Sequence, residues 1–385
     1  MEYRKFGNTD FNGSILGFGA MRLPVTDNRN RATIDEPLAG KMIACAIEQG
    51  VNYIDTAYFY HEGESERFVG RVLKDGYRNK VALATKMPVR LPKSHDDCNR
   101  ILDEQLGRLQ TDRIDYYLLH GLNHETWPNI RKIDIFTWAQ RAIADGRIRH
   151  FGFSFHDDFP TLKEIIDAYD QWTVCQIQYN YMDTEYQATT EGLNYAAQKG
   201  LSVVVMEPIR GGHLAKEPPA RVKDIFAEAP KPRSPAEWAL QWVWDQPGVS
   251  MVLSGMTAME HVVENCALAK RASENTLSAV ELKLIARAKE AYRELCPIPC
   301  TNCRYCMPCT NNIRINRIFE LYNDVHMYND TRVPRMRYGQ INPEQRGDQC
   351  IECGTCEDSC PQNIPIQEWL KKADELLAPK KASNK

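Results

Sequence analysis

Short apolar segments alternate with amphipathic segments along most of the chain, from residue 14 to about residue 271. This alternation is typical of βα units, in which each strand of a parallel sheet is followed by a helix. The apolar segments are rich in β-branched and aromatic residues, which indicates strands buried on both faces. Eight strands are predicted, over residues 14–19, 51–57, 81–86, 114–120, 148–154, 174–179, 201–207 and 249–255.

The number and spacing of these units favour one architecture. Eight βα units in about 260 residues match the size of a (β/α)8 TIM barrel, so a closed barrel is favoured over an open, doubly wound sheet. The helical segments show the expected periodicity, and one of them has a candidate N-terminal cap at Ser94. The segment before the first strand, residues 2–12, predicts a hairpin with a turn at Asn8 that closes the bottom of the barrel.

The character of the chain changes after the eighth unit. A strongly helical stretch over residues 277–295 is followed by Pro297, Pro299 and a group of cysteines, which indicates a domain boundary. The sequence therefore predicts an α/β barrel domain over residues 1–275, a linking helix over 276–295 and a small cysteine-rich domain over 296–385.

Polar side chains stand where three successive predicted strands end. Asp55 and Tyr60 follow the second strand, Lys86 ends the third and His120 ends the fourth. The carboxyl ends of barrel strands meet in one mouth, where barrel enzymes build their active sites. A neighbouring ammonium can lower the pKa of a tyrosine so that it acts as a general acid, and a carboxylate can fix that ammonium in place. Each residue alone is more often structural, but their conjunction favours catalysis.

The segments IDTAYFYHEGESE, TKMP, LLH and SGMTAMEHVVEN resemble the aldo-keto reductases, a (β/α)8 family that reduces carbonyls with an extended nicotinamide cofactor. The resemblance covers the whole predicted barrel. It implies that Asp55, Tyr60, Lys86 and His120 form the catalytic tetrad of the family, with Tyr60 rather than Tyr58 as the acid. It also implies that NADPH or NADH delivers a hydride to a small-molecule carbonyl substrate.

The same resemblance implies cofactor contacts on the later strands and loops. Ser154 and Gln176 would hold the carboxamide of the nicotinamide, and the loop with Gly211 and Gly212 would approach the pyrophosphate. Arg210 is a candidate charge partner there, with a surface-loop arginine as the alternative. The other implied cofactor positions are Met206, Gly255, Glu264 and Asn265.

Several positions depart from the family pattern. Met206 stands where many relatives place an aromatic residue that stacks on the nicotinamide. Where relatives hold the 2′-phosphate of NADPH with Lys or Arg, this chain has Gly255, Met256 and His261. Phe155 stands where an asparagine often follows the serine. The choice between NADPH and NADH therefore stays open.

Nine of the thirteen cysteines lie between residues 296 and 360. Zinc sites usually pair two C-x2-C motifs across a longer loop, and disulfides are rare in cytoplasmic proteins. The last four of these cysteines, residues 350 to 360, instead have the C-x2-C-x2-C-x3-C-P spacing of bacterial ferredoxins, whose cysteines hold [4Fe-4S] clusters. Eight of the nine cysteines form two arrays, Cys300-TN-Cys303-RY-Cys306-MP-Cys309 and Cys350-IE-Cys353-GT-Cys356-EDS-Cys360-Pro361.

Eight ligands match two [4Fe-4S] clusters. The first array departs from the ferredoxin pattern, because only two residues precede its last cysteine and Thr310 replaces the usual proline. Cys296 is interpreted as a buried structural thiol. The segment IFELYNDVHMY predicts helices around the clusters, which resembles the ferredoxin-type extensions of some aldo-keto reductases from anaerobic bacteria. By analogy with two-cluster ferredoxins, one cluster would be held by Cys300, Cys303, Cys306 and Cys360, and the other by Cys309, Cys350, Cys353 and Cys356.

The charge balance restricts the kind of partner. The chain has 48 basic and 51 acidic side chains and a formal net charge of -3, which leaves no global positive field to bind nucleic acid. No apolar run approaches the roughly 18 residues of a membrane span, and the first residues lack the apolar core of a signal peptide. The sequence therefore predicts a cytoplasmic protein with neither a nucleic-acid nor a membrane partner.

Three functions fit these observations. The first is an NAD(P)H-dependent carbonyl reductase whose clusters store or relay electrons. The second is a reductase fed by a ferredoxin or another electron carrier, with a flavin in between, because a nicotinamide moves two electrons at once and a cubane cluster moves one. The third is a redox sensor that binds nucleotide without catalysis. The tetrad argues against the third, and the sequence does not name a substrate.

Overall fold

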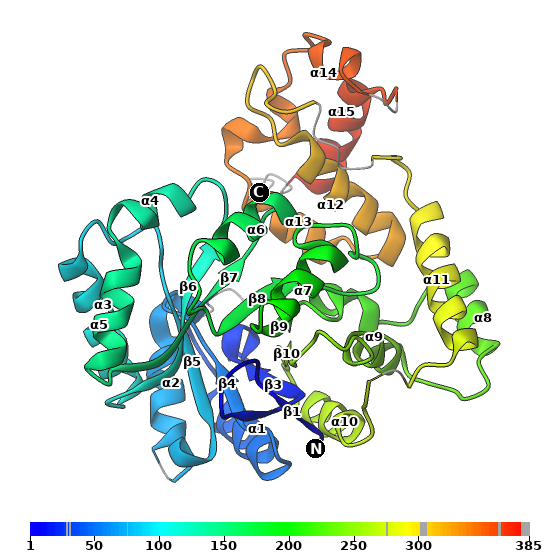
Figure 1. The fold of residues 1–385 in the computed structure, drawn as a ribbon. Helices are drawn as coiled ribbons and strands as arrows, with labels where there is room; N and C mark the ends of the chain where they lie inside the picture. The colour runs from blue at the N-terminus through cyan, green and yellow to red at the C-terminus, as the bar shows by residue number, and fades with distance from the viewer. Residues whose placement is uncertain are drawn as a thin grey trace. The chain divides into compact units, whose positions relative to one another are not determined.

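The computed structural model divides the chain into two compact units (Figure 1). The first unit contains Met1–Lys216 and Arg233–Ala279, and the second contains Glu217–Pro232 and Val280–Lys385. The residues that the structure describes are 1–27, 30, 32–74, 76–274, 276–300, 306–360 and 363–378.

The first unit is a closed barrel of eight parallel strands, which confirms the predicted fold class. Each strand pairs with its neighbour in the sequence, and the last strand pairs with the first. Every strand overlaps the segment predicted for it. In chain order they are β3 (Leu16–Gly19), β4 (Tyr53–Asp55), β5 (Ala82–Met87), β6 (Ile114–Leu122), β7 (Ile148–Phe155), β8 (Val174–Gln178), β9 (Ser202–Met206) and β10 (Met251–Ser254).

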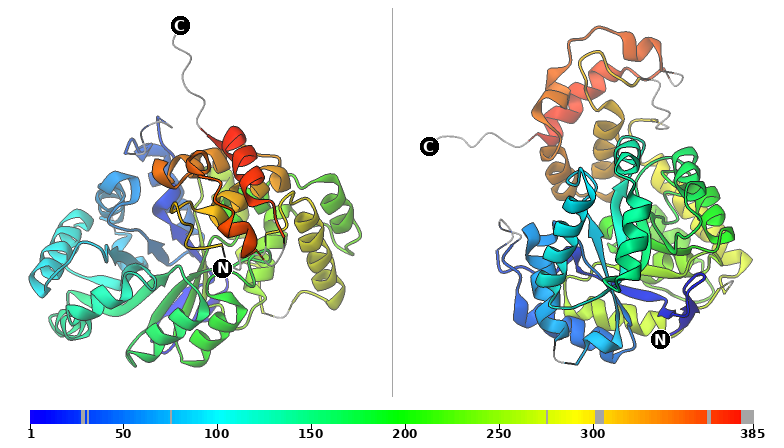
Figure 2. Two further views of the ribbon diagram at one scale, coloured as in Figure 1. Left: turned by 90° about the horizontal axis from the view of Figure 1, so that it is seen from above. Right: turned by 60° about the vertical axis from the view of Figure 1, so that its left-hand side comes forward.

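Helices surround the strands, as the view from above shows (Figure 2). The cap predicted at Ser94 is present, because its hydroxyl oxygen accepts a hydrogen bond from the Asp97 backbone N–H at the start of a helix. The helices of this unit are α1 (Glu36–Glu48), α2 (Glu64–Leu73), α3 (His95–Leu109), α4 (Trp127–Lys132), α5 (Ile135–Ala144), α6 (Phe159–Asp167), α7 (Thr189–Gln198), α9 (Pro235–Trp244) and α10 (Met259–Ala269). Its 3₁₀ turns are η1 (Ala20–Arg22), η2 (Tyr60–Gly63), η3 (Arg78–Lys80) and η4 (Arg210–Ala215).

The N-terminal hairpin closes the amino-terminal end of the barrel, as predicted. Strands β1 (Tyr3–Lys5) and β2 (Asn12–Ser14) pair in antiparallel fashion. In the loop between them, the fully buried Phe6 packs against Tyr53 and Tyr116, with ring centroids 5.5 and 4.9 Å apart. These aromatic side chains fill the amino-terminal end of the barrel, and the carboxyl ends of the strands are where barrel proteins bind their ligands.

The second unit is helical in its described part. Its apolar core includes Ile318, Phe319, Leu321 and Leu370. Six of the array cysteines pack against it: Cys300, Cys306, Cys309, Cys350, Cys356 and Cys360. The helix predicted from the segment IFELYNDVHMY is confirmed as part of α12. The elements are α8 (Ala220–Ala227), α11 (Ala279–Glu294), α12 (Ile315–Tyr328), α13 (Arg332–Gly339), η5 (Pro343–Gln345), η6 (Gly347–Gln349), α14 (Thr355–Asp358) and α15 (Ile366–Leu377).

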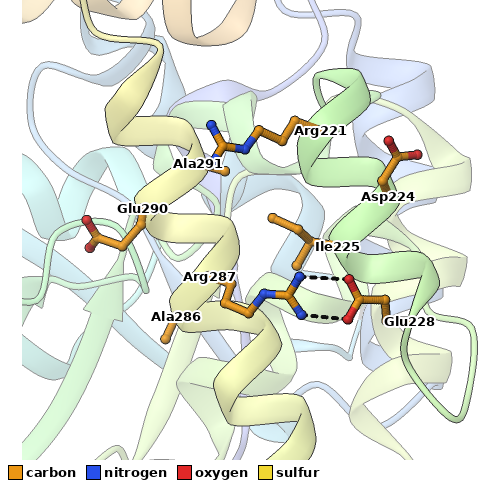
Figure 3. A pocket seen from close by; sticks show the side chains of 8 residues that line it. All are labelled: Arg221, Asp224, Ile225, Glu228, Ala286, Arg287, Glu290 and Ala291. Carbon is orange, nitrogen blue, oxygen red and sulfur yellow. Dashed lines mark hydrogen bonds and ion pairs between the residues drawn. The ribbon is translucent and has the colours of Figure 1, made fainter.

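Helix α8 lies in a segment that leaves the barrel unit after η4 and packs beside α11 (Figure 3). Arg287 of α11 forms two hydrogen bonds of 2.5 and 2.7 Å with the carboxylate of Glu228, and a cavity of about 500 Å³ lies between the two helices. The helix predicted over residues 276–295 is therefore α11, and the structure groups it with the cysteine-rich region. In the part of the chain that the structure describes, no helix has the length and apolar character required to cross a membrane.

Candidate active site

Three neighbouring strands bring the four predicted catalytic residues together at one end of the barrel. Asp55 ends β4, and Lys86 lies near the end of β5. The Lys86 ammonium nitrogen lies 2.7 Å from each carboxylate oxygen of Asp55 and 2.9 Å from the backbone oxygen of Thr56. Both side chains are buried. Burial opposes charge on Lys86, but the Asp55 carboxylate outweighs it and raises the pKa of Lys86, so the pair is ionised.

Tyr60 contacts this ion pair through its phenol. The hydroxyl oxygen lies 3.4 Å from the Lys86 ammonium nitrogen, and the ammonium also lies 5.0 Å from the centre of the Tyr60 ring. Burial raises the pKa of Tyr60, and the nearby Lys86 lowers it by a smaller amount. The net pKa of Tyr60 therefore lies above its ordinary value, because loss of solvent outweighs the effect of the ammonium. The phenol stays protonated at neutral pH, as a proton donor must be.

His120 completes the group from β6. Its ring stands edge-on to Tyr60, with the centroids 5.9 Å apart and the planes at 82°. Burial and the positive charge of Lys86 lower the pKa of His120 to about 3. The imidazole is therefore neutral over the physiological pH range, and one ring nitrogen carries a proton that can be donated.

The Tyr58 hydroxyl is directed away from this group. It donates a 2.9 Å hydrogen bond to Glu104 of α3. The Arg108 guanidinium lies 4.2 Å from the centre of the Tyr58 ring and donates to the Tyr58 backbone oxygen. Tyr58 therefore anchors the loop that carries Tyr60 to a surrounding helix.

A buried network behind Lys86 was not identified from the sequence. Glu66 of α2 is fully buried and accepts hydrogen bonds of 2.6 Å from Thr85 and Gln105 and of 3.1 Å from Arg108. Gln105 also donates to the backbone oxygen of Lys86 at 3.1 Å. Burial raises the pKa of Glu66, although the hydrogen bonds that it accepts oppose this effect.

Periodicity could have indicated the place of Glu66 in this network. Glu66 precedes Val69 and Leu73 by three and seven residues, so it lies on the apolar face of its helix. A charged residue on such a face needs a buried partner. The sequence offers no comparable rule that would select Arg108 as that partner.

The predicted carboxamide contacts lie side by side on β7 and β8. Ser154 and Gln176 are directly opposite each other in the strand ladder, and both are buried. The Ser154 hydroxyl oxygen accepts a 2.8 Å hydrogen bond from the Gly121 N–H, which follows His120. The Gln176 amide nitrogen lies 3.8 Å from the Met206 sulfur, whereas its carboxamide oxygen has no hydrogen-bond partner among the described residues.

Arg22 joins the loops that follow β9 and β10. It lies in η1, and its guanidinium donates a 2.8 Å hydrogen bond to the backbone oxygen of Gly211. A methyl group at Gly255 would lie only 3.2 to 3.3 Å from carbons of the Arg22 side chain, so Gly255 leaves room for that side chain. Arg22 was not predicted as a site residue, although its position three residues after the first barrel strand places it at the barrel mouth.

The remaining predicted cofactor residues each have a different environment. Arg210 is mostly buried, and its guanidinium lies 3.3 Å from the Asp183 carboxylate. On α10, Asn265 is buried and donates a 3.0 Å hydrogen bond to the Ser254 hydroxyl, which ends β10. Exposed Glu264 accepts a hydrogen bond from Ser234 instead. Gly212 has a φ of 100°, and a side chain built there would meet no atom within 4 Å, so the backbone is open to a ligand at this point.

Five cysteines of the second unit line one cavity. A cavity of about 130 Å³ is lined by Cys309, Cys350, Cys353 and Cys356, and by Cys306 of the first array. The four cysteines named first are the complete ligand set predicted for one cluster. Among the described residues, no three His, Cys, Asp or Glu side chains lie close enough together to hold a single metal ion.

The other predicted ligand set is described only in part. Cys300, Cys306 and Cys360 pack against the apolar core of the second unit. Cys303 lies outside the described residues. Cys296 is half-buried, and its thiol lies 3.9 Å from the backbone oxygen of Tyr292.

Comparisons with known proteins assign the barrel region and the cysteine-rich region to known families. The model of the aldo/keto reductase family matches residues 15–290, and the model of the 4Fe-4S dicluster domain matches residues 299–364. The oxidoreductase YqkF of Bacillus subtilis is 28% identical over 313 residues, which cover 73% of this chain and 96% of that protein. The methylglyoxal reductase YeaE of Escherichia coli is 30% identical over 65% of this chain and 84% of its own length.

A solved structure supports the same assignment. The holo form of the aldo-keto reductase AKR11C1 from Bacillus halodurans is 28% identical and superimposes with a TM-score of 0.63, over 75% of this chain and 96% of that one. The chain therefore belongs to the aldo/keto reductase family, as an NAD(P)-dependent oxidoreductase of that type whose C-terminal part is a 4Fe-4S dicluster domain.

Proposed function

We propose that the barrel unit reduces the carbonyl group of a small molecule with a hydride from NAD(P)H, and that Tyr60 is the proton donor. The observation that carries this proposal is the contact of the Tyr60 phenol with the buried Lys86–Asp55 ion pair, beside a neutral His120. A positioned acid of this kind accelerates a reaction by about 10²- to 10⁴-fold.

Each residue has a defined part in the proposed reaction. The nicotinamide, when bound, supplies a hydride to the carbonyl carbon. The Tyr60 phenol gives its proton to the carbonyl oxygen, and Lys86 stabilises the phenolate that is left behind. Asp55 holds Lys86 in position, and the ring N–H of neutral His120 orients the carbonyl oxygen beside the phenol. A proton from solvent then restores the phenol, so one hydride and one proton convert the carbonyl to an alcohol.

The polar groups on β7 and β8 fit the nicotinamide. The Gln176 carboxamide oxygen is a buried acceptor without a partner among the described residues, which is costly unless a ligand donates to it. The amide nitrogen of a nicotinamide carboxamide is such a donor, and the adjacent Ser154 hydroxyl can donate to its oxygen. Met206, in contact with Gln176, would lie next to the ring.

The loops after β9 and β10 fit the phosphates of the nucleotide. Arg22 places a guanidinium at Gly211, and the open backbone at Gly212 allows close approach of an anion. We assign Arg22 to this site together with the glycine loop, and we place Gly255, Glu264 and Asn265 towards the adenosine end. Arg210 would act there only through Asp183, with which it is paired.

Turnover and nucleotide binding test this function separately. The protein prepared without oxygen should oxidise NADPH or NADH, followed at 340 nm, when a small carbonyl compound is added. Methylglyoxal is the first substrate to test, because a relative is named for its reduction. Titration with each nucleotide alone, followed by protein fluorescence, measures affinity without turnover. If the protein binds neither nucleotide, the proposal is wrong.

We further propose that the second unit holds two [4Fe-4S] clusters. The cavity lined by Cys309, Cys350, Cys353 and Cys356 supports one complete ligand set. The other set would consist of Cys300, Cys303, Cys306 and Cys360. Thiolates of three closely spaced cysteines and one distant cysteine are the ligands of ferredoxin clusters.

The iron content of the protein should reflect this stoichiometry. Protein prepared without oxygen is expected to contain about eight iron and eight sulfide per chain, and Cys353→Ala should remove about half of each. Metal analysis and acid-labile sulfide assays measure both. Cys175→Ala is a matched control, since that thiol is buried in the barrel. Zinc in place of iron, or four iron in the unaltered protein, would contradict the two-cluster assignment.

We propose electron transfer as the role of the clusters, with a ferredoxin or a similar carrier as the partner. Cys353→Ala should then abolish reduction driven by a reduced viologen dye while leaving reduction by NAD(P)H at its normal rate. A reductase fed only through the clusters, with a flavin as converter, would instead show no reduction by NAD(P)H in the unaltered protein and would lose the dye-driven reaction in Cys353→Ala. If Cys353→Ala and the unaltered protein reduced the substrate with the dye at equal rates, the clusters would have a structural role only.

A further inference from the structure

The sulfur of one proposed cluster ligand lies beside a hydroxyl group from the other array. Thr310 follows Cys309, and its Oγ1 lies 3.8 Å from the Cys353 sulfur, a contact between residues 43 positions apart. Both side chains line the same cavity, and both are exposed. Thr310 occupies the place where the ferredoxin pattern usually has a proline, which has no hydroxyl group.

A second threonine also contacts this sulfur. Thr355, at the start of α14, lines the same cavity, and its backbone N–H and hydroxyl lie near the Cys353 sulfur. Groups from two separate segments therefore converge on one of the four thiols that line the cavity. This places the Cys353 sulfur in a polar environment at the exposed side of the cavity.

Binding of iron determines the direction of the hydrogen bond with Thr310. In the metal-free protein the Cys353 thiol can donate its proton to the Thr310 oxygen. A cysteine that binds iron does so as a thiolate and has no proton to give. The contact can then persist only if the Thr310 hydroxyl donates to the sulfur. Because the acceptor is charged, such a bond is stronger than one between neutral groups.

We propose that Thr310 donates a hydrogen bond to the Cys353 sulfur in the cluster-loaded protein and thereby raises the reduction potential of that cluster. Reduction by one electron adds negative charge that is shared with the ligand sulfurs, and a hydrogen-bond donor stabilises the more negative state. Thr310 is thus a tuning residue that makes this cluster a better electron acceptor than it would be with the usual proline. The inference rests on the proposed ligation by Cys353.

Matched variants of the full chain test this inference. Thr310→Val removes the hydroxyl with little change in volume, and Thr310→Ser keeps it. Ser359→Ala is the control, because Ser359 lines the same cavity but donates its hydroxyl to the Thr355 backbone oxygen at 2.9 Å. Midpoint potentials are measured by anaerobic titration with dithionite, followed by electron paramagnetic resonance, and iron content is measured in the same samples.

The expected result is a shift to lower potential of one of two midpoint potentials in Thr310→Val, with both potentials unchanged in Thr310→Ser and in Ser359→Ala. Unchanged potentials in Thr310→Val with full iron content would overturn the inference and leave the cluster assignment intact. If Thr310→Val loses iron, Thr310→Ala is compared with Thr310→Ser, and equal potentials in that pair would overturn the inference. Failure of the ligation itself would show as full iron content in Cys353→Ala.

Discussion

Tyr60→Phe is expected to lower the rate of carbonyl reduction by about 10²- to 10⁴-fold while leaving nucleotide affinity near that of the unaltered protein. The substitution removes only the hydroxyl, which lies 3.4 Å from Lys86 and is the proton source in the proposed reaction. Steady-state rates with NAD(P)H and a small carbonyl compound, together with fluorescence titration of the nucleotide, measure the two quantities independently.

Tyr58→Phe is the matched control for this experiment. Tyr58 lies two residues earlier in the same loop, and its hydroxyl donates to Glu104 rather than to the ion pair. Its loss should leave turnover close to normal, since the ring and the backbone contact with Arg108 are retained. Equal turnover in Tyr60→Phe and the unaltered protein would remove Tyr60 from the mechanism, and a large loss only in Tyr58→Phe would reverse the assignment.

Lys86→Met is expected to affect both stability and chemistry. It leaves the buried Asp55 carboxylate without its cation, and breaking a buried ion pair in this way costs about 3–5 kcal/mol. The melting temperature of the barrel should therefore fall. In the double variant Asp55→Asn/Lys86→Met no carboxylate remains at this position, so the melting temperature should recover while turnover stays low.

The reverse reaction reveals the electrostatic effect of Lys86 on Tyr60. Oxidation of an alcohol requires the Tyr60 phenolate as a base, so its rate should rise with pH as the phenol loses its proton. Removal of the Lys86 ammonium raises the pKa of Tyr60 further, and the rise in rate should move to higher pH in Lys86→Met. A profile that rises at the same pH in both proteins would contradict the pairing of the phenol with the ammonium.

Much of the barrel could be predicted because its determinants are local. The eight strands each overlap a predicted segment, and the Ser94 cap and the N-terminal hairpin are present. Placing Asp55, Lys86 and His120 at the ends of successive strands was enough to bring them together, because neighbouring parallel strands end at the same edge. Cysteine spacing likewise marked out the two arrays, and members of both, Cys306 and Cys309 of the first and Cys350, Cys353 and Cys356 of the second, line one cavity.

Other features depend on contacts that sequence spacing does not encode. Arg22 contacts Gly211 across 189 residues, and Arg108 pairs with Glu66 across 42. The grouping of α8 with the second unit is equally nonlocal, since residues on both sides of that segment belong to the barrel.

The sequence alone determined the architecture of eight βα units, the four side chains near the strand ends and the two cysteine arrays. It could do so because hydrophobic period and ligand spacing are properties of residues close together in the chain. Only the tertiary structure decided the state of these groups. The sequence shows an ammonium that should lower the pKa of Tyr60, yet the pKa is raised, because closure of the barrel removes solvent from the phenol. The same burial makes His120 neutral. Solvent exclusion is a property of the whole packed barrel, and no single segment of the chain contains it.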